Sequence, residues 1–271
     1  MKFMKNTYSL IGAVIAKPVP GKYWKVLINY ILLIMVCLSL VNWVYGQPQI
    51  VFNLSPSGYP PYMFQRDNEP AQGIIFDVLK LVADKYGYEI ILARIPKNRE
   101  VLYLKSGDLD ANALAKEWVD HPEDFEFTGV IVEARDVLFS LKSAPVKFNN
   151  IKDLYGKTIG IHLGYSYPLL TKGFDQGLFY RSNTNSELAM LGKVWMERTD
   201  AAVVNELVAH WLIKENPHWQ GKFEVSKKEI GGFDYRIQFS KKWKGFVVKF
   251  NQELTRMKGD GGLKKIKARY K

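Results

Sequence analysis

Residues 50–82 read IVFNLSPSGYPPYMFQRDNEPAQGIIFDVLKLV, and this stretch decides the fold. The apolar run at 50–54 predicts a buried strand. A loop of serine, glycine, proline and tyrosine follows. Gly73 then opens a segment whose apolar side chains fall on one face of a helix: Ile74, Ile75, Val78, Leu79 and Val82. Gly87 stands where a helix commonly ends. A strand, a loop and an amphipathic helix in this order indicate an α/β protein.

The same order of elements recurs along the chain. A helix, a turn, an aspartate and a strand come together twice, at Asp110 and at Asp200, as expected of two lobes built on one plan. We expect an α/β protein with residues 47–139 and 236–271 in the first lobe and 140–235 in the second. Two extended segments, 137–141 and 235–239, are our candidate hinges. The other strands are expected at 88–95, 111–115, 158–162 and 201–204, and helices at 98–105, 187–197, 205–214, 243–257 and 263–270.

The first 46 residues indicate export. Five lysines precede an apolar run at 26–45, and no acidic residue occurs before Asp67. This pattern predicts an N-terminal signal peptide that directs the chain to the periplasm, with cleavage after residues 44–46. An uncleaved anchor is the alternative, because about twenty apolar residues can span a bilayer. Cys37, the single cysteine, lies in this leader.

Composition argues against nucleic-acid binding and against catalysis. The formal charge of +11 includes the five leader lysines, so the rest of the chain carries +6, and for an exported protein nucleic acid is a poor candidate partner. The four histidines show no metal-ligand spacing, and the sequence has neither a GxSxG elbow nor a P-loop. We therefore expect no metal, no cofactor and no catalytic residues.

Eight short motifs occur along the chain in a fixed order: YPPY at 59–62, GIIFDV at 73–78, SGDLD at 106–110, FT at 127–128, DLYGK at 153–157, GIHLG at 160–164, DAAVV at 200–204 and GDGG at 259–262. In order and spacing they resemble the bacterial extracellular solute-binding proteins, family 3, over nearly all of 47–271. The resemblance implies a periplasmic-binding-protein-like fold of type II, with two α/β lobes joined by a two-strand hinge. It also implies a small solute in the cleft, a membrane permease of an ABC-type transporter as partner, and a monomer.

Two positions depart from the pattern of the family's amino-acid binders. That pattern implies an arginine for the ligand carboxylate some seven residues before FT, where this chain has His121. It implies an aspartate for the ligand ammonium five residues after Asp200, where this chain has Asn205. A charge buried without its partner is costly. We therefore expect a small polar ligand other than a standard α-amino acid.

Ten residues are our candidate ligand contacts, each with an ordinary structural role as its alternative. Aromatic side chains after the first strand could stack on a ligand. An acid, an indole and an imidazole follow the third strand, and a hydroxyl and an amide stand where helices begin. An arginine after the second strand could replace the missing one. They are Tyr59, Tyr62, Phe64, Arg99, Glu117, Trp118, His121, Tyr165, Ser166 and Asn205.

Three functions stay open at this point. Capture of a solute for a membrane transporter is the expected one. A sensory or adaptor protein would use the same clamp to signal to a membrane sensor. A dehydratase-like enzyme on the same fold is the third, because the spatial pairing of carboxylates such as Glu117 cannot be deduced from the sequence.

Overall fold

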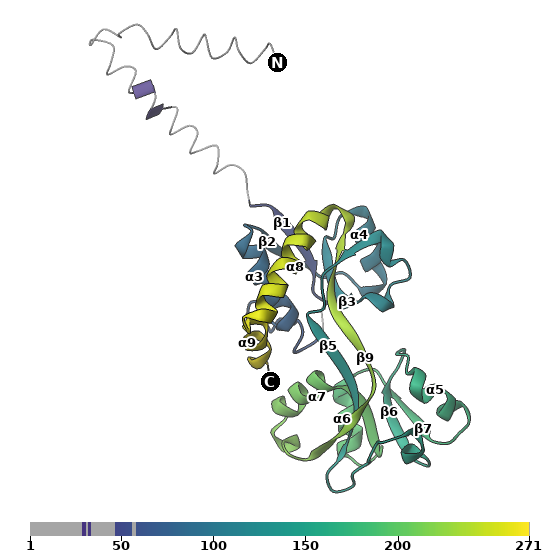
Figure 1. Ribbon diagram of the computed structural model, residues 1–271. Helices are drawn as coiled ribbons and strands as arrows, with labels where there is room; N and C mark the ends of the chain where they lie inside the picture. The colour runs from purple at the N-terminus through teal and green to yellow at the C-terminus, as the bar shows by residue number, and fades with distance from the viewer. Residues whose placement is uncertain (1–28, 31, 34–46, 56–57, 271) are drawn as a thin grey trace, which may run out of the picture. The chain divides into compact units, whose positions relative to one another are not determined.

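The computed structural model describes residues 29–30, 32–33, 47–55 and 58–270 (Figure 1). The predicted cleavage site and Cys37 lie outside the described residues, as do Pro56, Ser57 and Lys271. Residues 49–271 form one compact unit. No helix in the described part of the chain combines the length and the hydropathy needed to cross a bilayer.

One hydrogen-bonded sheet of nine strands runs through the described chain. Its order is β2-β1-β3-β9-β5-β8-β6-β7, and β4 pairs with β9 beside this path. The outer strands on each side are parallel, whereas β9 and β5 in the middle are antiparallel to their neighbours. The sheet therefore has two parallel halves, one in each lobe, linked by an antiparallel centre.

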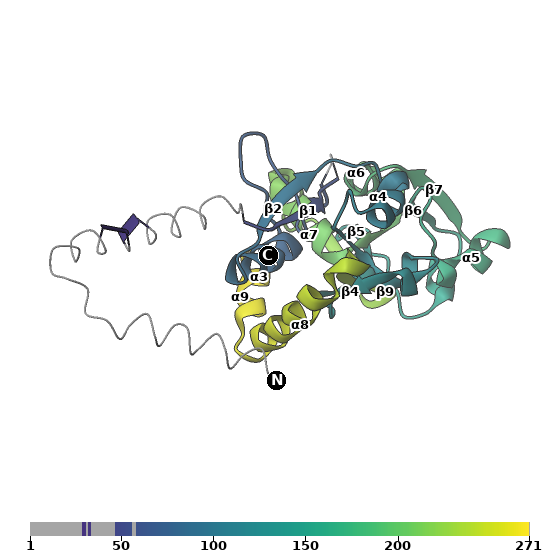
Figure 2. The same ribbon diagram turned by 90° about the horizontal axis from the view of Figure 1, so that it is seen from above.

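In the first lobe the strands are β1 (Gln49–Asn53), β2 (Glu89–Ala93), β3 (Ala111–Ala115) and β4 (Phe125–Phe127). Helix α3 (Ile74–Lys85) buries its predicted apolar face against them. The last two helices, α8 (Lys244–Gly259) and α9 (Gly262–Ala268), lie beside α3 (Figures 1 and 2). The C-terminal helices therefore pack in the first lobe. The same lobe contains α4 (Glu100–Ser106) and four short 3-10 turns: η1 (Lys97–Arg99), η2 (Lys116–Trp118), η3 (Pro122–Asp124) and η6 (Lys241–Trp243).

The second lobe repeats the plan with β6 (Thr158–His162), β7 (Tyr180–Thr184) and β8 (Ala201–Asn205). Two hydrophobic clusters fill it. One gathers around α6 (Glu187–Trp195) and α7 (Glu206–Glu215), and the other lies under α5 (Pro168–Asp175). The turns η4 (Ile151–Leu154) and η5 (Pro217–Trp219) complete the lobe.

Two long strands, β5 (Val132–Leu141) and β9 (Phe223–Ser240), pass from one lobe to the other (Figure 1). The candidate hinge 137–141 pairs with β8 in the second lobe, and 235–239 pairs with β3 in the first. Both segments are therefore held within the sheet. The crossing lies between them, where the register of β5 against β9 shifts at Asp136. Gly232 pairs there with Arg135, and a Cβ on Gly232 would lie 2.7 Å from the Ala134 carbonyl oxygen.

Helix α7 also contacts the first lobe. Val208 is buried in that lobe's core, and the ring centroids of Trp211 and Phe64 are 5.1 Å apart. At the surface, Arg66 Nη2 lies 2.9 Å from Glu215 Oε2. Apolar contacts therefore join the lobes at α7 in addition to the crossing strands.

Gly73 connects the loop after β1, helix α3 and the C-terminus. Its φ of 125° favours glycine, and a Cβ there would lie 2.5 Å from the Tyr62 carbonyl oxygen. Its N–H donates to Tyr270 Oη at 2.9 Å, and that hydroxyl donates to Asp77 Oδ2 at 2.8 Å. The position of the Tyr62 loop therefore depends on the absence of a side chain at residue 73.

We expect Gly73→Ala to lower the free energy of unfolding by about 3 kcal/mol or more, because strained φ and a backbone clash act together. The control is Gly87→Ala, where φ is 74° and nothing lies within 4 Å of the added Cβ. It should cost only about 1–2 kcal/mol. Urea unfolding followed by circular dichroism measures both, and equal losses would contradict the clash.

Candidate ligand-binding site

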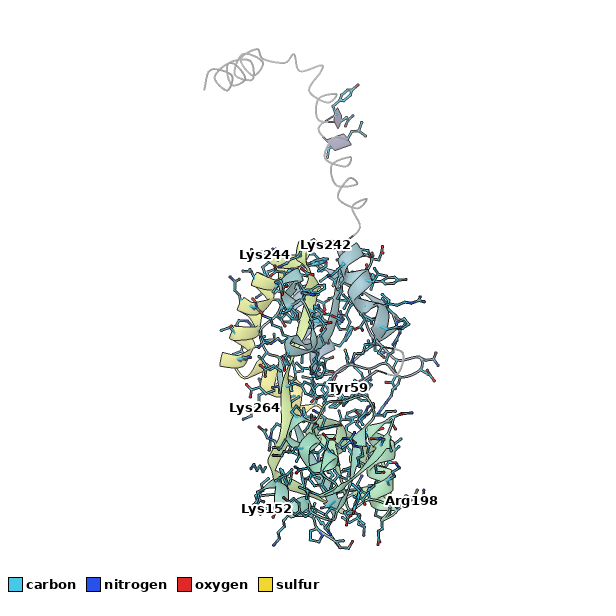
Figure 3. All side chains as sticks on the ribbon, turned by 90° about the vertical axis from the view of Figure 1, so that its right-hand side faces the viewer. Tyr59, Lys152, Arg198, Lys242, Lys244 and Lys264 are labelled. Carbon is cyan, nitrogen blue, oxygen red and sulfur yellow. The ribbon has the colours of Figure 1, made fainter. Side chains whose placement is uncertain are left out.

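A cavity of about 520 Å³ lies between the lobes, a size typical of small-ligand sites. Every parallel strand contributes its carboxyl end to it, as open α/β sheets do. From the first lobe come Tyr59, Lys97 and Trp118, after β1, β2 and β3; Figure 3 labels Tyr59 between the lobes. The second lobe and the crossing strands supply the rest: Asp136, Gly164, Tyr165, Ser166, Tyr167, Pro168, Glu187, Val203, Val204, Asn205, Ile230, Gly231, Gly232, Phe233 and Tyr235.

Aromatic rings form a continuous wall on the first-lobe side of this cavity. The centroid of Trp118 lies 4.5 Å from that of Phe233 and 6.2 Å from that of Tyr235. Tyr59 extends the wall, with its centroid 6.4 Å from Tyr235. From the second lobe Tyr165 also lines the cavity. The cavity between the lobes is therefore lined by aromatic rings from both sides.

Two carboxylates line the cavity. Asp136 lies in β5 where the strands cross, and Glu187 is the first residue of α6. Burial raises the pKa of Asp136 to about 6; the negative charge of Glu187 adds to this, and the amide of Asn205 opposes it. Burial, together with Glu187 and Asp136, raises the pKa of the Tyr165 hydroxyl to about 12. The site is thus acidic and partly shielded from water.

Asn205 connects the two lobes at the cavity. It ends β8 and caps α7, where its Oδ1 accepts from the Val208 N–H at 3.3 Å. The same oxygen accepts from Tyr62 Oη, in the other lobe, at 2.7 Å. Because both bonds use Oδ1, the amide nitrogen Nδ2 takes part in neither. Nδ2 is buried without a partner of normal hydrogen-bond geometry among the described residues.

Half of the predicted contacts lie on the cavity: Tyr59, Trp118, Tyr165, Ser166 and Asn205. The other five lie elsewhere. Tyr62 is fully buried behind Tyr59, with its ring stacked at 5.5 Å, and Phe64 packs on Trp211 and Tyr270.

The three polar candidates outside the cavity lining are exposed. Glu117 accepts a hydrogen bond from the Asp234 N–H at 3.2 Å, and His121 lies 3.3 Å from Glu123 on the surface. Arg99 belongs to the turn η1 after β2.

Our sequence reasoning missed several lining residues, above all Asp136, Glu187 and Lys97. Glu187 follows β7, a strand that the apolar pattern does not reveal because Tyr180–Thr184 is polar. Asp136 was not distinguished from the other charged residues before the expected hinge. A charged residue at a lobe crossing is the signal that could have identified it.

Two α/β lobes joined by two crossing strands, with a ligand-sized cavity between them, define a bilobed binding protein of the type II periplasmic-binding-protein fold. The chain belongs to the bacterial extracellular solute-binding proteins, family 3, whose family profile matches residues 53–271. The resemblance inferred from the motifs is therefore confirmed.

Among curated proteins, the chain is similar to the arginine-binding extracellular protein of Bacillus subtilis, with 25% identity over 229 residues, 83% of this chain and 87% of the relative. It is also similar to the probable histidine-binding protein of Campylobacter jejuni, with 26% identity over 205 residues, 75% of this chain and 77% of the relative. Its fold is similar to that of substrate-binding domain 2 of Lactococcus lactis GlnP in an open conformation. That likeness has a TM-score of 0.66 and 20% identity, and covers 83% of this chain and 96% of that one.

The raised pKa of Asp136 predicts a pH-dependent stability. Because the carboxyl moves from its ordinary 3.8 to about 6 on folding, its ionisation opposes folding above about pH 6 and has no effect below about pH 4. Asp136→Asn removes that cost, so we expect the variant to be more stable than the parent by about 2–3 kcal/mol at pH 8 and equal to it below pH 4. Ligand-free protein unfolded in urea across this range measures the difference, and a constant difference at every pH would contradict the assignment.

Proposed function

We propose that the protein is exported, captures a small solute between its lobes and delivers it to the membrane permease of an ABC-type transporter. Its ligand is a small molecule other than a standard α-amino acid. The observation that carries the proposal is the cavity, which is lined from both lobes and from the strands that cross between them.

The geometry supports capture by closure. Rotation of one lobe about the crossing at Asp136 and Gly232 would change the gap between Tyr59 and the second lobe without breaking either half of the sheet. Tyr59 Oη already lies 3.5 Å from Glu187 Oε1 across that gap. Binding and closure by this motion require no chemical step.

The composition of the cavity supports a ligand other than an α-amino acid. Among the described residues that line it there is no arginine, the residue whose planar guanidinium best matches a carboxylate. His121 lies on the surface beside Glu123, outside the cavity lining. Although curated relatives are named for arginine and histidine, an α-carboxylate entering this site would face Asp136 and Glu187.

Thermal unfolding tests the ligand class. After removal of bound solute by unfolding and refolding, the purified protein is heated with each standard amino acid and with amines, sugars and organic acids. A solute at a hundred times its Kd stabilises the fold by about 2.7 kcal/mol, which raises Tm by roughly 5–10 °C at this size. We expect the largest shift outside the standard amino acids.

Two tryptophan variants locate the binding. Trp118→Ala should abolish the shift because the indole lines the cavity, whereas Trp195→Ala, outside the cavity lining, should retain it. Arginine, histidine or glutamine as the strongest ligand would overturn the proposed ligand class. If no solute of the panel raises Tm, the proposal that the protein binds a solute is wrong.

Export has its own test. Intact-mass measurement on protein isolated from the periplasmic fraction should give a chain that begins near Gln47, since cleavage is expected after residues 44–46. Recovery of a full-length chain in the membrane fraction would show that the N-terminal segment is an uncleaved anchor and would contradict cleavage of a signal peptide.

A further inference from the structure

The two carboxylates of the cavity are unpaired within the described part of the chain. Neither Asp136 nor Glu187 takes part in any ion pair of the described residues. Among the described residues, Glu187 accepts only the long bond from Tyr59 Oη. Carboxylates withdrawn from water are normally paired or neutralised. The cavity therefore presents two charges that the described structure leaves unbalanced.

Two other shielded carboxylates, Asp110 and Glu253, have basic partners, whereas Glu100 accepts hydrogen bonds from the Asn53 and Asn112 amides. Asp110 lies 2.7 Å from Lys242 Nζ and accepts a bond from the Val51 N–H. Glu253 pairs with both Lys85 and Arg256. Asp110 and Glu253 are thus balanced by cations, which Asp136 and Glu187 lack among the described residues.

The arginine next to Asp136 is engaged elsewhere. Arg135, next to Asp136 in sequence, bonds to Glu206, Glu229 and the Lys227 carbonyl oxygen.

Two lysines complete the cationic surroundings. Lys193 of α6 donates to Ser182 Oγ and to the Asn183 carbonyl oxygen. Lys97, the one cation among the described residues that line the cavity, is exposed, with Nζ 5.7 Å from the centroid of the Trp118 ring. Hence the described side chains that contact the two cavity carboxylates are neutral: the Asn205 amide at Asp136 and the Tyr59 hydroxyl at Glu187.

Aromatic faces add a second attraction for a cation. Tyr59, Trp118, Phe233 and Tyr235 supply rings on the first-lobe side and Tyr165 on the other. The negative face of an aromatic ring attracts a cation within about 6 Å, and such cages recognise ammonium ligands in other proteins. An anion would be repelled by the same faces and by both carboxylates.

We propose that the ligand is a small organic cation without an α-carboxylate, whose charged nitrogen lies between Asp136, Glu187 and the aromatic rings. This inference rests on the proposed function, because it names the ligand class of the same cavity. Where the family's amino-acid binders are expected to have an arginine and an aspartate, this chain has His121 and Asn205, and its cavity presents two carboxylates instead. The ligand supplies the positive charge that both carboxylates lack.

Two matched ligand pairs test the inference by titration calorimetry on the purified protein. Agmatine and L-arginine differ only by the α-carboxylate, and choline and 3,3-dimethylbutan-1-ol differ by the positive charge. Putrescine and succinate extend the panel. We expect at least one of agmatine, choline and putrescine to bind, and to bind at least about 10-fold more tightly than arginine, the neutral alcohol or succinate.

Two neutralising variants then assign the contact. Asp136→Asn and Glu187→Gln should each weaken binding of the cation about 10-fold or more, because each removes a charge-assisted contact. Glu123→Gln makes the same chemical change on the surface, outside the cavity lining, and should leave affinity within about twofold. Circular dichroism confirms that each variant is folded.

The outcomes separate the inference from the function on which it rests. Binding of a neutral, anionic or α-amino-acid ligand in preference to these cations, or unchanged affinity in both cavity variants, overturns the cation assignment while leaving solute binding in place. Failure of every solute to bind overturns the proposed function as well.

Discussion

The antiparallel pairing of β5 with β9 is the constraint on which the rest of the structure depends. These two strands belong to both lobes, and each parallel half of the sheet is built outward from them. Because parallel strands bring their carboxyl ends to one edge, the two halves turn those ends toward a shared cavity. The register shift at Asp136 places a carboxylate at this crossing, and Gly232 permits the close approach of the two backbones.

The cavity is assembled at a cost in stability. Asp136 is shielded without a basic partner, and Asn205 Nδ2 is buried without a bond of normal geometry among the described residues. Unsatisfied groups of this kind are concentrated at functional sites, because a ligand can satisfy them. The second lobe is also held by Tyr62 and by the α7 contacts, so the proposed closure must preserve or exchange those contacts. Stability lost in the ligand-free protein is then available as binding free energy.

The local pattern of apolar residues was sufficient to predict most of the helices and strands. Gly73 and the apolar face after it predicted α3, and the strands at 111–115 and 158–162 were placed at the bounds that the structure gives. Two strands were not predicted: β4, Phe125–Phe127, which has only three residues, and β7, Tyr180–Thr184, whose polar residues occupy a sheet edge and carry no apolar signal. The candidate hinge segments 137–141 and 235–239 pair with β8 and β3, and the register of β5 against β9 shifts next to the first of them, at Asp136.

The sequence by itself determined the family and the two α/β lobes, because these depend on local apolar periodicity and on ordered motifs. It also revealed that His121 and Asn205 stand where charged residues are expected. Only the tertiary structure brought Asp136 and Glu187 to one cavity and placed His121 on the surface outside it. Asp136 and Glu187 are 51 positions apart in the chain, and the pairing of the strands brings them to the same cavity. A local sequence pattern does not specify which strands pair, so it could not predict this proximity.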